Sequence, residues 1–449
     1  MAEVGERLPG APAESADRIV LHVDMDCFYA ACERLREPAL VGEPVVVGMG
    51  YDAGEPHGAV ATASYEARAF GVESAMPISQ ALERLPRREE PGPAEDDASA
   101  SEAGEPAADA GESDTSEDDP TGVYRPVDMD FYRSVSEEVR DILHEVADVV
   151  REVSIDEAYL DVTERTDWAV VEGFARHVKQ RIAREVGVTA SVGVAPNMSA
   201  AKVASDREKP DGLVVVRPGE VRAFLADLPI DDLHGVGPVT AGELREAGVE
   251  TVGDLAEADA DWVAERYGER GRDLRRRARG EDDRAVEPVG EPKSLSRESS
   301  LTDPTADPAT KGERVGRLAA SVADRARRKG ALYRTIGIKL VEPPYEVHTR
   351  ARSLPGPVDD PELVESVALE LLEEFETTTA RKLGVRVSNL SFADQAQANL
   401  ETWEPGQAAS RGEPTEPGDG DGVREPRAGH GWRPGRAGRP VQTTLSDFV

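Results

Sequence analysis

Two apolar segments that lie far apart in the chain carry carboxylates inside strand-like runs. They are residues 19–29 (IVLHVDMDCFY) and residues 154–161 (SIDEAYLD). Because a charge is costly to bury unless it is paired or holds a metal, we expect the two segments to converge and bring Asp24, Asp156 and Glu157 together. Carboxylate oxygens with open water positions suit Mg²⁺, and two such ions can clamp the attacking and leaving oxygens of a phosphoryl transfer. The pattern therefore predicts metal-assisted phosphoryl or nucleotidyl transfer.

The charge balance of the chain is strongly acidic. Its 449 residues include 88 Asp and Glu against 53 Lys and Arg, a formal net charge of −35, and only eight of the basic residues are Lys. This composition is typical of a protein from a cytoplasm with molar salt, where the Debye length is about 3 Å at 1 M. An ordinary protein with acidic insertions is the alternative, but the acidity also pervades the segments expected to fold. Screening in such salt weakens the usual argument that an acidic chain avoids nucleic acid.

The cysteines and the hydropathy indicate a cytoplasmic protein. Cys27 and Cys32 lack a second ligand pair at a zinc-site spacing, so we interpret them as free thiols in a reducing interior. No stretch approaches 18 apolar residues, and residues 1–17 are acidic and rich in Pro and Gly. We therefore expect neither a membrane span nor a signal peptide.

The composition also divides the chain. Residues 1–17 and 395–440 lack apolar periodicity, and residues 87–121 contain essentially no large apolar residue, so we predict that all three are disordered. We interpret 87–121 as an insertion looped out of a fold, with an acidic interaction motif as the alternative. The alternation of helical and strand patterns over 128–216 predicts an α+β layer. The expected elements there are helices over 131–150 and 168–186 and a strand hairpin over 153–162.

A glycine turn and an arginine cluster suggest contacts with a nucleic-acid backbone. Gly235 and Gly237 lie between two helical patterns, which favours a helix–hairpin–helix whose backbone N–H groups point at a phosphate. A plain helical turn is the alternative. Six arginines then fall within residues 270–279, including Arg275, Arg276 and Arg277. We interpret them as phosphate contacts, and a solvated helix face paired with the acidic residues that follow is the alternative.

Several motifs, in order along the chain, resemble those of Y-family DNA polymerases, in the branch of DNA polymerase IV (DinB type). The two acidic segments described above resemble the two catalytic motifs of that family. The resemblance runs from about residue 18 to residue 394, and with the composition it indicates a halophilic archaeal source. The matching segments are 22–29 (HVDMDCFY), 61–72 (ATASYEARAFGV), 154–162 (SIDEAYLDV), 191–197 (SVGVAPN), 201–206 (AKVASD) and 209–212 (KPDG).

The resemblance implies an α+β multidomain fold shaped like a right hand. We expect a palm, fingers, a helix–hairpin–helix thumb and a little finger, acting as a monomer on primer–template DNA. The implied boundaries are a tail (1–17), the palm (18–27 and 122–216), the fingers (28–86), the acidic insertion (87–121), the thumb (217–284), a linker (285–292), the little finger (293–394), a second linker (395–440) and a terminal peptide (441–449).

The resemblance also implies a metal site. Asp24, Asp156 and Glu157 would hold two Mg²⁺ ions, with the backbone carbonyl of Met25 as a further ligand. Because side chains alternate faces along a strand, Asp156 and Glu157 should diverge, so we place them at a hairpin turn where both reach the metals. One ion would activate the primer 3′-hydroxyl, and the other would neutralise the triphosphate and the leaving pyrophosphate.

The resemblance also assigns roles to further residues, according to their positions in the motifs. Tyr29 resembles a steric gate, whose ring sits where a ribose 2′-hydroxyl must go; a core aromatic is the alternative. Tyr65 and Arg68 resemble ligands of the dNTP triphosphate, because a phenol hydroxyl and a guanidinium fork suit phosphate oxygens. Thr62 and Lys209 are additional candidates for the same group.

The remaining motif residues bear on fidelity. We interpret Asp26 and Asp161 as structural residues or as residues that support the metal ligands, with direct metal contact as the alternative. The small residues 59–63 would enclose the nascent base pair loosely. By resemblance this implies a DNA-directed DNA polymerase of low fidelity that tolerates damaged templates in translesion synthesis and lacks proofreading.

The last residues of the chain resemble a peptide that docks on sliding clamps of the PCNA type. Gln442, Leu445 and Phe448 fit the pattern Q-x-x-L-x-x-F. Gln would fill one pocket, and the two apolar side chains of one helical turn would fill another. The segment ends in Val449 where the common form has a second aromatic residue.

Two other classes of function compete with a polymerase. A non-catalytic DNA-bound scaffold could recruit the clamp, but it has no need of three buried carboxylates. A palm-type nucleotide cyclase could use the same metals, but it needs neither a duplex grip nor a clamp peptide.

Overall fold

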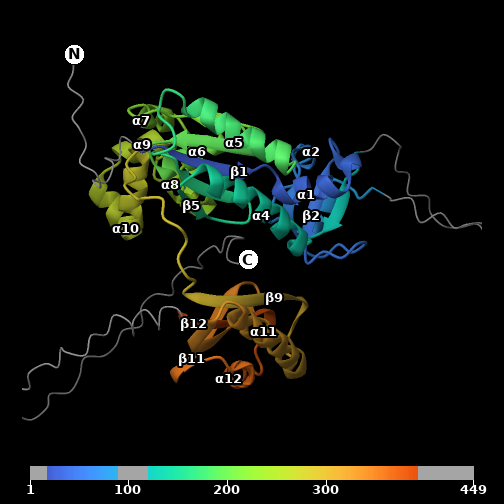
Figure 1. Ribbon diagram of the computed structural model, residues 1–449. Coiled ribbons are helices and arrows are strands. Elements are labelled where there is room, and N and C mark those ends of the chain that lie inside the picture. The colour runs from blue at the N-terminus through green and yellow to red at the C-terminus, as the bar shows by residue number, and fades with distance from the viewer. Residues whose placement is uncertain (1–17, 89–119, 393–449) are drawn as a thin grey trace, which may run out of the picture. The chain divides into compact units, whose positions relative to one another are not determined.

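The computed structural model describes residues 18–88 and 120–392. The terminal tail, most of the acidic insertion, the second linker and the clamp peptide with Gln442, Leu445 and Phe448 lie outside the described residues. The chain divides into two compact units after Val289, a position inside the segment that we predict to be a linker. The two units are described separately (Figure 1).

The first unit is built on a five-stranded sheet with the order β5-β6-β1-β7-β8. The central strand β1 pairs antiparallel with both β6 and β7, and all six of its residues are buried. A strand that is buried on both faces requires helices on each side of the sheet. The strands are β1 (Val20–Met25), β5 (Val149–Glu152), β6 (Glu157–Asp161), β7 (Ala190–Ala195) and β8 (Leu213–Val215).

Helices cover both faces of this sheet, and they pack against different residues of β1. Leu21 and Val23 belong to the core cluster that includes buried residues of α4 and α5. Val20 belongs to the cluster formed with α6. Because side chains alternate along a strand, His22 and Asp24 share the α6 face with Val20. The helices are α4 (Met129–Val146), α5 (Val171–Glu185) and α6 (Met198–Asp206).

The helix expected over 131–150 ends earlier than the sequence pattern suggests. Ala147 has an extended backbone (φ −131°, ψ 148°) and ends α4. Val149 and Val150 then pair with Asp161 and Leu160 in the sheet. Apolar spacing cannot separate a last helical turn from a short buried strand, and tertiary pairing assigns the two valines to β5.

The first unit also contains a separate three-stranded sheet with the order β3-β2-β4. Its core includes Val46, Val60, Ile78 and Tyr124. The acidic insertion interrupts the chain between α3 and β4. The elements are α1 (Phe28–Arg36), η2 (Pro38–Leu40), β2 (Val45–Met49), β3 (Ala59–Ala63), α2 (Tyr65–Arg68), α3 (Ile78–Arg84) and β4 (Val123–Pro126).

Short helices complete the first unit. The buried residues Leu233, Val236 and Leu244 flank the Gly-x-Gly turn and pack with Leu274 of the last helix in one core cluster. The elements are α7 (Val221–Ala226), η3 (Ile230–Asp232), α8 (Pro238–Glu246), α9 (Val252–Glu257) and α10 (Ala260–Ala278).

The second unit is an antiparallel sheet with the order β11-β10-β12-β9. Ile336, Ile338 and Leu340 on β10 are buried with residues of both helices, whereas Gly337 and Lys339 between them face away from the helices. The elements are β9 (Ser294–Thr305), α11 (Pro308–Arg328), β10 (Ala331–Glu342), β11 (Glu346–Val358), α12 (Pro361–Glu373) and β12 (Ala380–Phe392).

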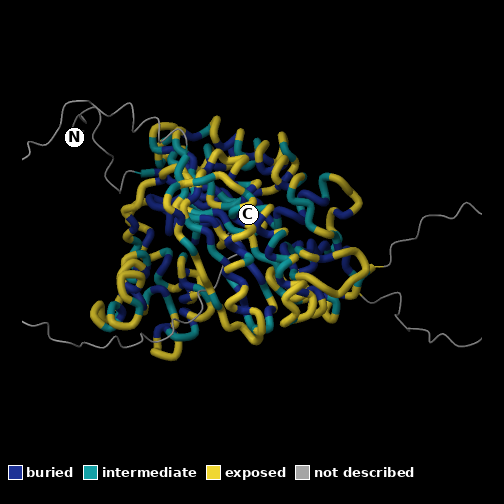
Figure 2. The backbone as a smooth tube through the Cα atoms, turned by 90° about the horizontal axis from the view of Figure 1, so that it is seen from below, coloured by how far each residue is buried: buried dark blue, intermediate teal, exposed yellow. Residues whose placement is uncertain are grey.

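Burial follows this layering. All residues of β1 and β7 are buried, and Figure 2 shows buried (dark blue) and exposed (yellow) stretches alternating along the backbone. Among the described residues, no helix is long and apolar enough to cross a membrane.

Candidate active site

The two acidic segments converge at one end of the central sheet. Asp24 on β1 lies directly opposite Glu157 on β6, and the Met25 amide donates to the Asp156 carbonyl at 2.9 Å. The Asp24 side chain is 7% exposed and that of Glu157 is 27% exposed. Directly opposed residues of an antiparallel pair point to the same face. The two carboxylates therefore sit together on the α6 face of the sheet.

Two lysines compensate this negative charge. Lys202 on α6 places its Nζ 2.8 Å from Asp24 Oδ2 and 3.4 Å from Glu157 Oε2. Lys209 Nζ lies 2.7 Å from the same Asp24 oxygen. Asp206 stands between the lysines, 3.3 Å from Lys202 and 2.8 Å from Lys209. The site thus already favours a positive charge between the two strand carboxylates.

The pKa values of the site follow from burial and from these neighbours. Burial alone would raise the pKa of Glu157, but the His22 ring 3.3 Å away and the charge of Lys202 lower it to about 2. Burial opposes the charge of Lys202, yet Asp24 and Glu157 raise its pKa above the usual value. For His22, burial lowers the pKa. At neutral pH Glu157 is therefore ionised beside an ammonium group and a neutral imidazole.

Asp156 lies next to this pair but on the other side of the chain. Its neighbours in a small cavity include Val23, Met25 and Val139, and its Oδ1 accepts a hydrogen bond from Ser154 at 2.5 Å. Burial raises the pKa of Asp156 to about 6; the Ser154 hydrogen bond opposes this, and the charges of Glu157 and Asp24 add to it. The negative charges of Asp24 and Glu157 are therefore close enough to disfavour the charged form of Asp156.

The donor set fits a divalent ion. Ligand atoms of His22, Asp24 and Glu157 lie within 4.8 Å of one another. His22 is fully buried, its Nδ1 lies 2.8 Å from Ser205 Oγ, and its Nε2 lies 3.3 Å from Glu157. Carboxylate oxygens are the ligands that hard cations such as Mg²⁺ prefer. Sequence reasoning missed His22, although its alternation with Asp24 on one strand is a usable signal.

Tyr29 lies in the first turn of α1, the helix that follows β1, and the charge of Asp156 acts on its hydroxyl. It is 6% exposed, and its ring stacks on that of Tyr132 with centroids 4.6 Å apart and an interplanar angle of 19°. Burial, with a smaller contribution from the charge of Asp156, raises the pKa of Tyr29 to about 12. The ring is therefore neutral and held against a second aromatic side chain.

The predicted triphosphate ligands lie on β3 and α2. Thr62 and Tyr65 are half-buried, and Arg68 is exposed. The Tyr65 hydroxyl donates to Asp26 Oδ1 at 3.3 Å, and the Arg68 guanidinium lies 4.8 Å from the centroid of the Tyr65 ring. Arg68 Nε donates to the Ala63 carbonyl at 3.0 Å.

Asp26 and Asp161 have structural contacts. Asp26 is 2% exposed and accepts hydrogen bonds from Ser191 Oγ at 2.8 Å and from the Asp211 amide at 2.8 Å, besides the one from Tyr65. Asp161 lies at the opposite end of β6 and accepts from the Thr163 amide at 3.0 Å. These contacts agree with the structural role expected for both residues.

The glycine turn has the conformation that only glycine readily adopts. Gly235 has φ +97°, in the region that disfavours side chains. Gly237 is the N-cap of α8, with Pro238 as the first helical residue. The turn carbonyls are occupied from α10: Arg270 donates to Gly235 O at 3.0 Å, and Arg277 donates to His234 O at 3.3 Å.

The arginine cluster is partly engaged within the unit. Arg275 donates to the Ala258 carbonyl at 2.8 Å. Arg276 forms an ion pair with Asp283 at 2.6 Å, which is the pairing that the alternative interpretation anticipates. Arg275 and Arg276 therefore already have partners within the unit. The sequence alone does not reveal the contact of Arg275 with Ala258.

Comparison with known proteins places this site in a family. A model of the impB/mucB/samB family matches residues 23–206, the C-terminal domain of that family matches residues 292–400, and the IMS family HHH motif matches residues 218–249. DNA polymerase IV of Halobacterium salinarum is 61% identical over 396 residues, which cover 88% of this chain and 90% of that protein. The chain belongs to the Y family of DNA polymerases. It is a DNA-directed DNA polymerase of the DNA polymerase IV branch.

Solved structures show the same polymerase fold. A Y-family DNA polymerase chimera, Dbh-Dpo4(243-245)-Dbh, has a TM-score of 0.68 and 28% identity, over 83% of this chain and 99% of that one. A structure described as an insertion ternary complex of Dbh DNA polymerase has a TM-score of 0.56 and 27% identity, with the same coverage. The α+β right-hand fold with a helix–hairpin–helix and a little finger is therefore confirmed.

Proposed function

We propose that this polymerase adds dNTPs to a primer 3′-hydroxyl by two-metal nucleotidyl transfer, at low fidelity, without proofreading, and in the service of translesion synthesis. The observation that carries the proposal is the register pairing of Asp24 with Glu157, with Asp156 in the next position. The comparison of primer extension by the wild type and by variants that lack these carboxylates tests it.

The residues that would hold the metals are the carboxylates of Asp24, Asp156 and Glu157 and the carbonyl of Met25. Bound Mg²⁺ would supply activation of the primer hydroxyl and neutralisation of charge on the triphosphate and pyrophosphate. Glu157 stays ionised for this task because His22 and Lys202 oppose the effect of burial on its pKa. Lys202 and Lys209 lie 2.8 and 2.7 Å from Asp24 and offset its negative charge.

Four residues would bind the incoming nucleotide and one would select its sugar. Thr62, Tyr65, Arg68 and Lys209 are proposed to bind the triphosphate, and Tyr29 is proposed to exclude the 2′-hydroxyl of a ribonucleotide. A buried ring fixed by stacking suits the task of a steric gate better than a mobile one. The small side chains of 59–63 are proposed to enclose the base pair loosely, which would allow damaged templates.

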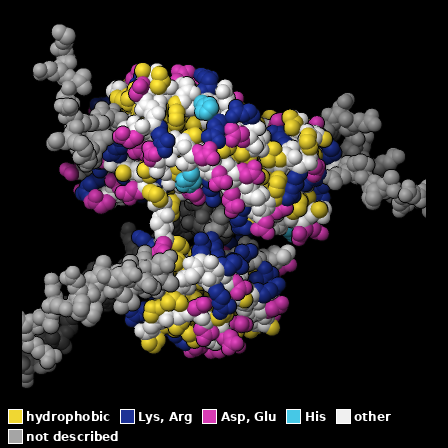
Figure 3. Space-filling model, in the orientation of Figure 1, with side chains coloured by type: hydrophobic (Ala, Val, Ile, Leu, Met, Phe, Trp, Pro, Cys, Tyr) yellow, Lys and Arg dark blue, Asp and Glu magenta, His cyan; other side chains and the backbone are white. Residues whose placement is uncertain are grey.

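Primer–template DNA is proposed to contact both units through polar groups. In the first unit the candidates are the amides at Gly235 and Gly237 and the side chains of Arg275, Arg276 and Arg277. In the second unit they are residues on the sheet face that α11 and α12 leave uncovered. Figure 3 shows Lys and Arg side chains gathered on one side of the second unit. Candidate residues of that face are Ser296, Thr335, Gly337, Lys339, Arg386 and Ser388.

The acidic composition supports work at molar salt. With a formal net charge of −35, we propose that the protein acts as a monomer in a halophilic cytoplasm, where long-range repulsion is screened. Two competing functions fit less well. A scaffold does not explain a compensated carboxylate pair on a central strand, and a cyclase does not explain the similarity over 88% of the chain to a DNA polymerase.

The terminal peptide is proposed to bind a PCNA-type clamp. Replacing Gln442, Leu445 and Phe448 together with alanine should reduce clamp-stimulated extension by at least about tenfold, because the tether supplies effective concentration rather than chemistry. Extension without clamp should be unchanged. The control replaces Thr443 and Ser446, which the motif leaves free. If both variants respond equally to the clamp, the peptide is not the docking site.

The acidic insertion is proposed to be dispensable for catalysis. Its ends are already held together, because the Arg88 amide donates to Gly122 O and the Gly122 amide donates to Pro86 O, both at 2.8 Å. Replacing residues 89–119 with a short Gly-Ser link should leave kcat/KM for primer extension within about twofold of the wild type, since loop-closure entropy changes slowly with length. A tenfold loss in the same assay would assign a catalytic or DNA-binding task to the insertion.

A further inference from the structure

Tyr132 connects two residues that lie one turn apart on α1. Its ring stacks on Tyr29 with centroids 4.6 Å apart. Its hydroxyl donates to Glu33 Oε1 at 2.5 Å. Tyr29 and Glu33 are separated by four positions on one helix and therefore share a face. A single side chain from α4 thus contacts the proposed steric gate at its ring and a carboxylate at its hydroxyl.

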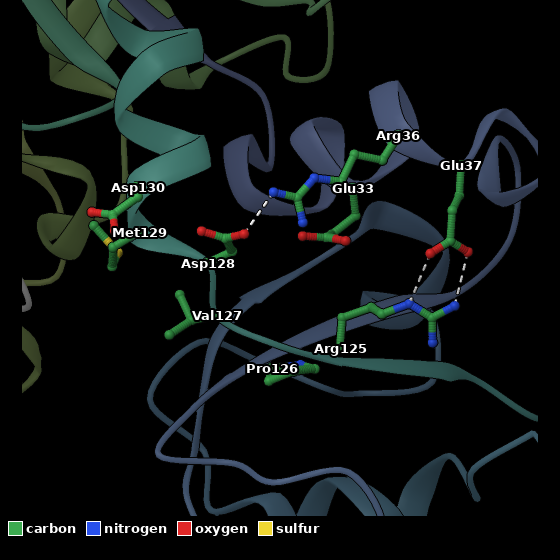
Figure 4. A pocket seen from close by; sticks show the side chains of 9 residues that line it. All are labelled: Glu33, Arg36, Glu37, Arg125, Pro126, Val127, Asp128, Met129 and Asp130. Carbon is green, nitrogen blue, oxygen red and sulfur yellow. Dashed lines mark hydrogen bonds and ion pairs between the residues drawn. The ribbon is translucent and has the colours of Figure 1, made fainter.

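Glu33 is an unusual partner, because it is a carboxylate with only 4% of its surface exposed. It lines a cavity of about 530 Å³ between α1, β4 and the start of α4, together with Arg36, Arg125 and Asp128. Figure 4 shows the two arginines directed to other carboxylates: Arg36 bonds Asp128 at 2.6 Å, and Arg125 bonds Glu37 at 2.8 Å. Burial of a charged group is costly unless it is hydrogen-bonded, so the Tyr132 hydroxyl has a definite task at Glu33.

The contact fixes the Tyr132 ring in its own plane. Stacking alone lets two rings slide, because offset arrangements differ little in energy. The short hydrogen bond to Glu33 Oε1 is directional. Tyr132 is fully buried, and burial, followed by the hydrogen bond to Glu33, raises its pKa above the usual range. The hydroxyl therefore keeps its proton and remains the donor.

We propose that Glu33 is a positioning residue for Tyr29: it holds Tyr132 by the hydroxyl and thereby sets how strictly the gate excludes ribonucleotides. This inference rests on the proposed role of Tyr29. A residue that selects one hydroxyl group must be placed within about 0.5 Å, and a loosely stacked ring would yield to a 2′-hydroxyl. The competing interpretation is that the hydrogen bond only stabilises the junction between α1 and α4.

The selectivity of the polymerase for deoxyribonucleotides over ribonucleotides distinguishes these two interpretations. The measured quantity is the ratio of kcat/KM for dCTP to that for CTP opposite template dG, in molar KCl with Mg²⁺. A loss of folded protein lowers both values equally and leaves the ratio unchanged. Tyr132→Phe keeps the stacking ring and removes the hydroxyl, and we expect it to lower the ratio on the order of tenfold, since small misplacements cost about this much or more.

A matched set of variants completes the experiment. Glu33→Leu should lower the ratio as Tyr132→Phe does, and the double variant should lower it no further, because both act through one hydrogen bond. Glu33→Gln still offers an acceptor oxygen and should restore most of the ratio. Glu37→Gln, on the same helix and cavity but paired with Arg125, is the control and should leave the ratio unchanged.

Tyr29→Ala distinguishes the two possible failures. If Tyr29→Ala collapses the ratio while Tyr132→Phe and Glu33→Leu leave it at the wild-type value, the gate stands and the positioning role of Glu33 is wrong. If Tyr29→Ala itself leaves the ratio unchanged, Tyr29 is not the gate and both proposals are wrong.

Discussion

Replacing Asp156 and Glu157 together with alanine should reduce primer extension by at least about 10³-fold. Metal-assisted charge stabilisation is worth several kcal/mol, and each 1.36 kcal/mol corresponds to a tenfold change in rate. The variant also leaves Asp24 with Lys202 and Lys209 as neighbours, so the remaining carboxylate is compensated and the site loses its attraction for a divalent ion. Single-turnover extension of a labelled primer, with saturating DNA and Mg²⁺, measures the loss.

The control for this variant removes two carboxylates elsewhere on the palm. Asp148→Ala/Glu164→Ala changes the charge by the same amount on exposed residues, and its extension rate should match the wild type. Primer–template affinity, measured by fluorescence anisotropy, should be similar for both double variants. If Asp156→Ala/Glu157→Ala retains more than a tenth of the wild-type rate, the assignment of these residues to the metals is wrong.

Gly193→Ala should be the most damaging single-methyl change in the described part of the chain. A Cβ at Gly193 would lie 2.0 Å from Ala201 O and 2.3 Å from Ser205 N, because α6 presses its backbone onto β7. Overpacking of a tight interior costs about 1–3 kcal/mol and occasionally more, and contacts with backbone atoms cannot be relieved by a rotamer change. We expect a loss of about 3 kcal/mol in the free energy of unfolding, measured with urea in molar KCl.

Gly193→Ala should also lower the activity of the folded protein. The helix that must shift carries Lys202, whose ammonium neutralises Asp24 and Glu157, so kcat should fall in the fraction that remains folded. The matched control is Gly173→Ala on α5, where a Cβ meets nothing within 4 Å. It should leave the unfolding free energy unchanged or raise it by up to about 1 kcal/mol through helix propensity. Equal unfolding midpoints for the two variants would contradict the close approach of α6 to β7.

The carboxylate pair of the site is predictable from the sequence because strand periodicity is local. Residues alternate between faces along a strand, and a charge in an apolar strand needs a partner, so Asp24 and Glu157 are marked by their surroundings alone. The convergence of the two strands is expected from the cost of burying their charges, and the resemblance to a polymerase family implies it independently. The structure confirms the fold that this resemblance implies.

Other parts of the site depend on tertiary contacts that no local pattern encodes. In the sequence, Lys202 stands out only as part of the segment 201–206. Its position between two strand carboxylates follows from the packing of α6 on β7. The scarcity of lysine in this chain is a signal that could have marked it. The end of α4 at Ala147 depends on the pairing of the following residues in the sheet. The ion pair of Arg276 with Asp283 depends on how the chain folds back after α10.

Primer extension by the wild-type protein tests the central claim most directly. The reaction would contain molar KCl, Mg²⁺, dNTPs and either an undamaged template or one with a single abasic site. The account predicts extension to the end of the undamaged template, and synthesis past the abasic site on the damaged one. No extension on either template, by a protein that still binds primer–template and clamp, would contradict it and favour a DNA-bound scaffold.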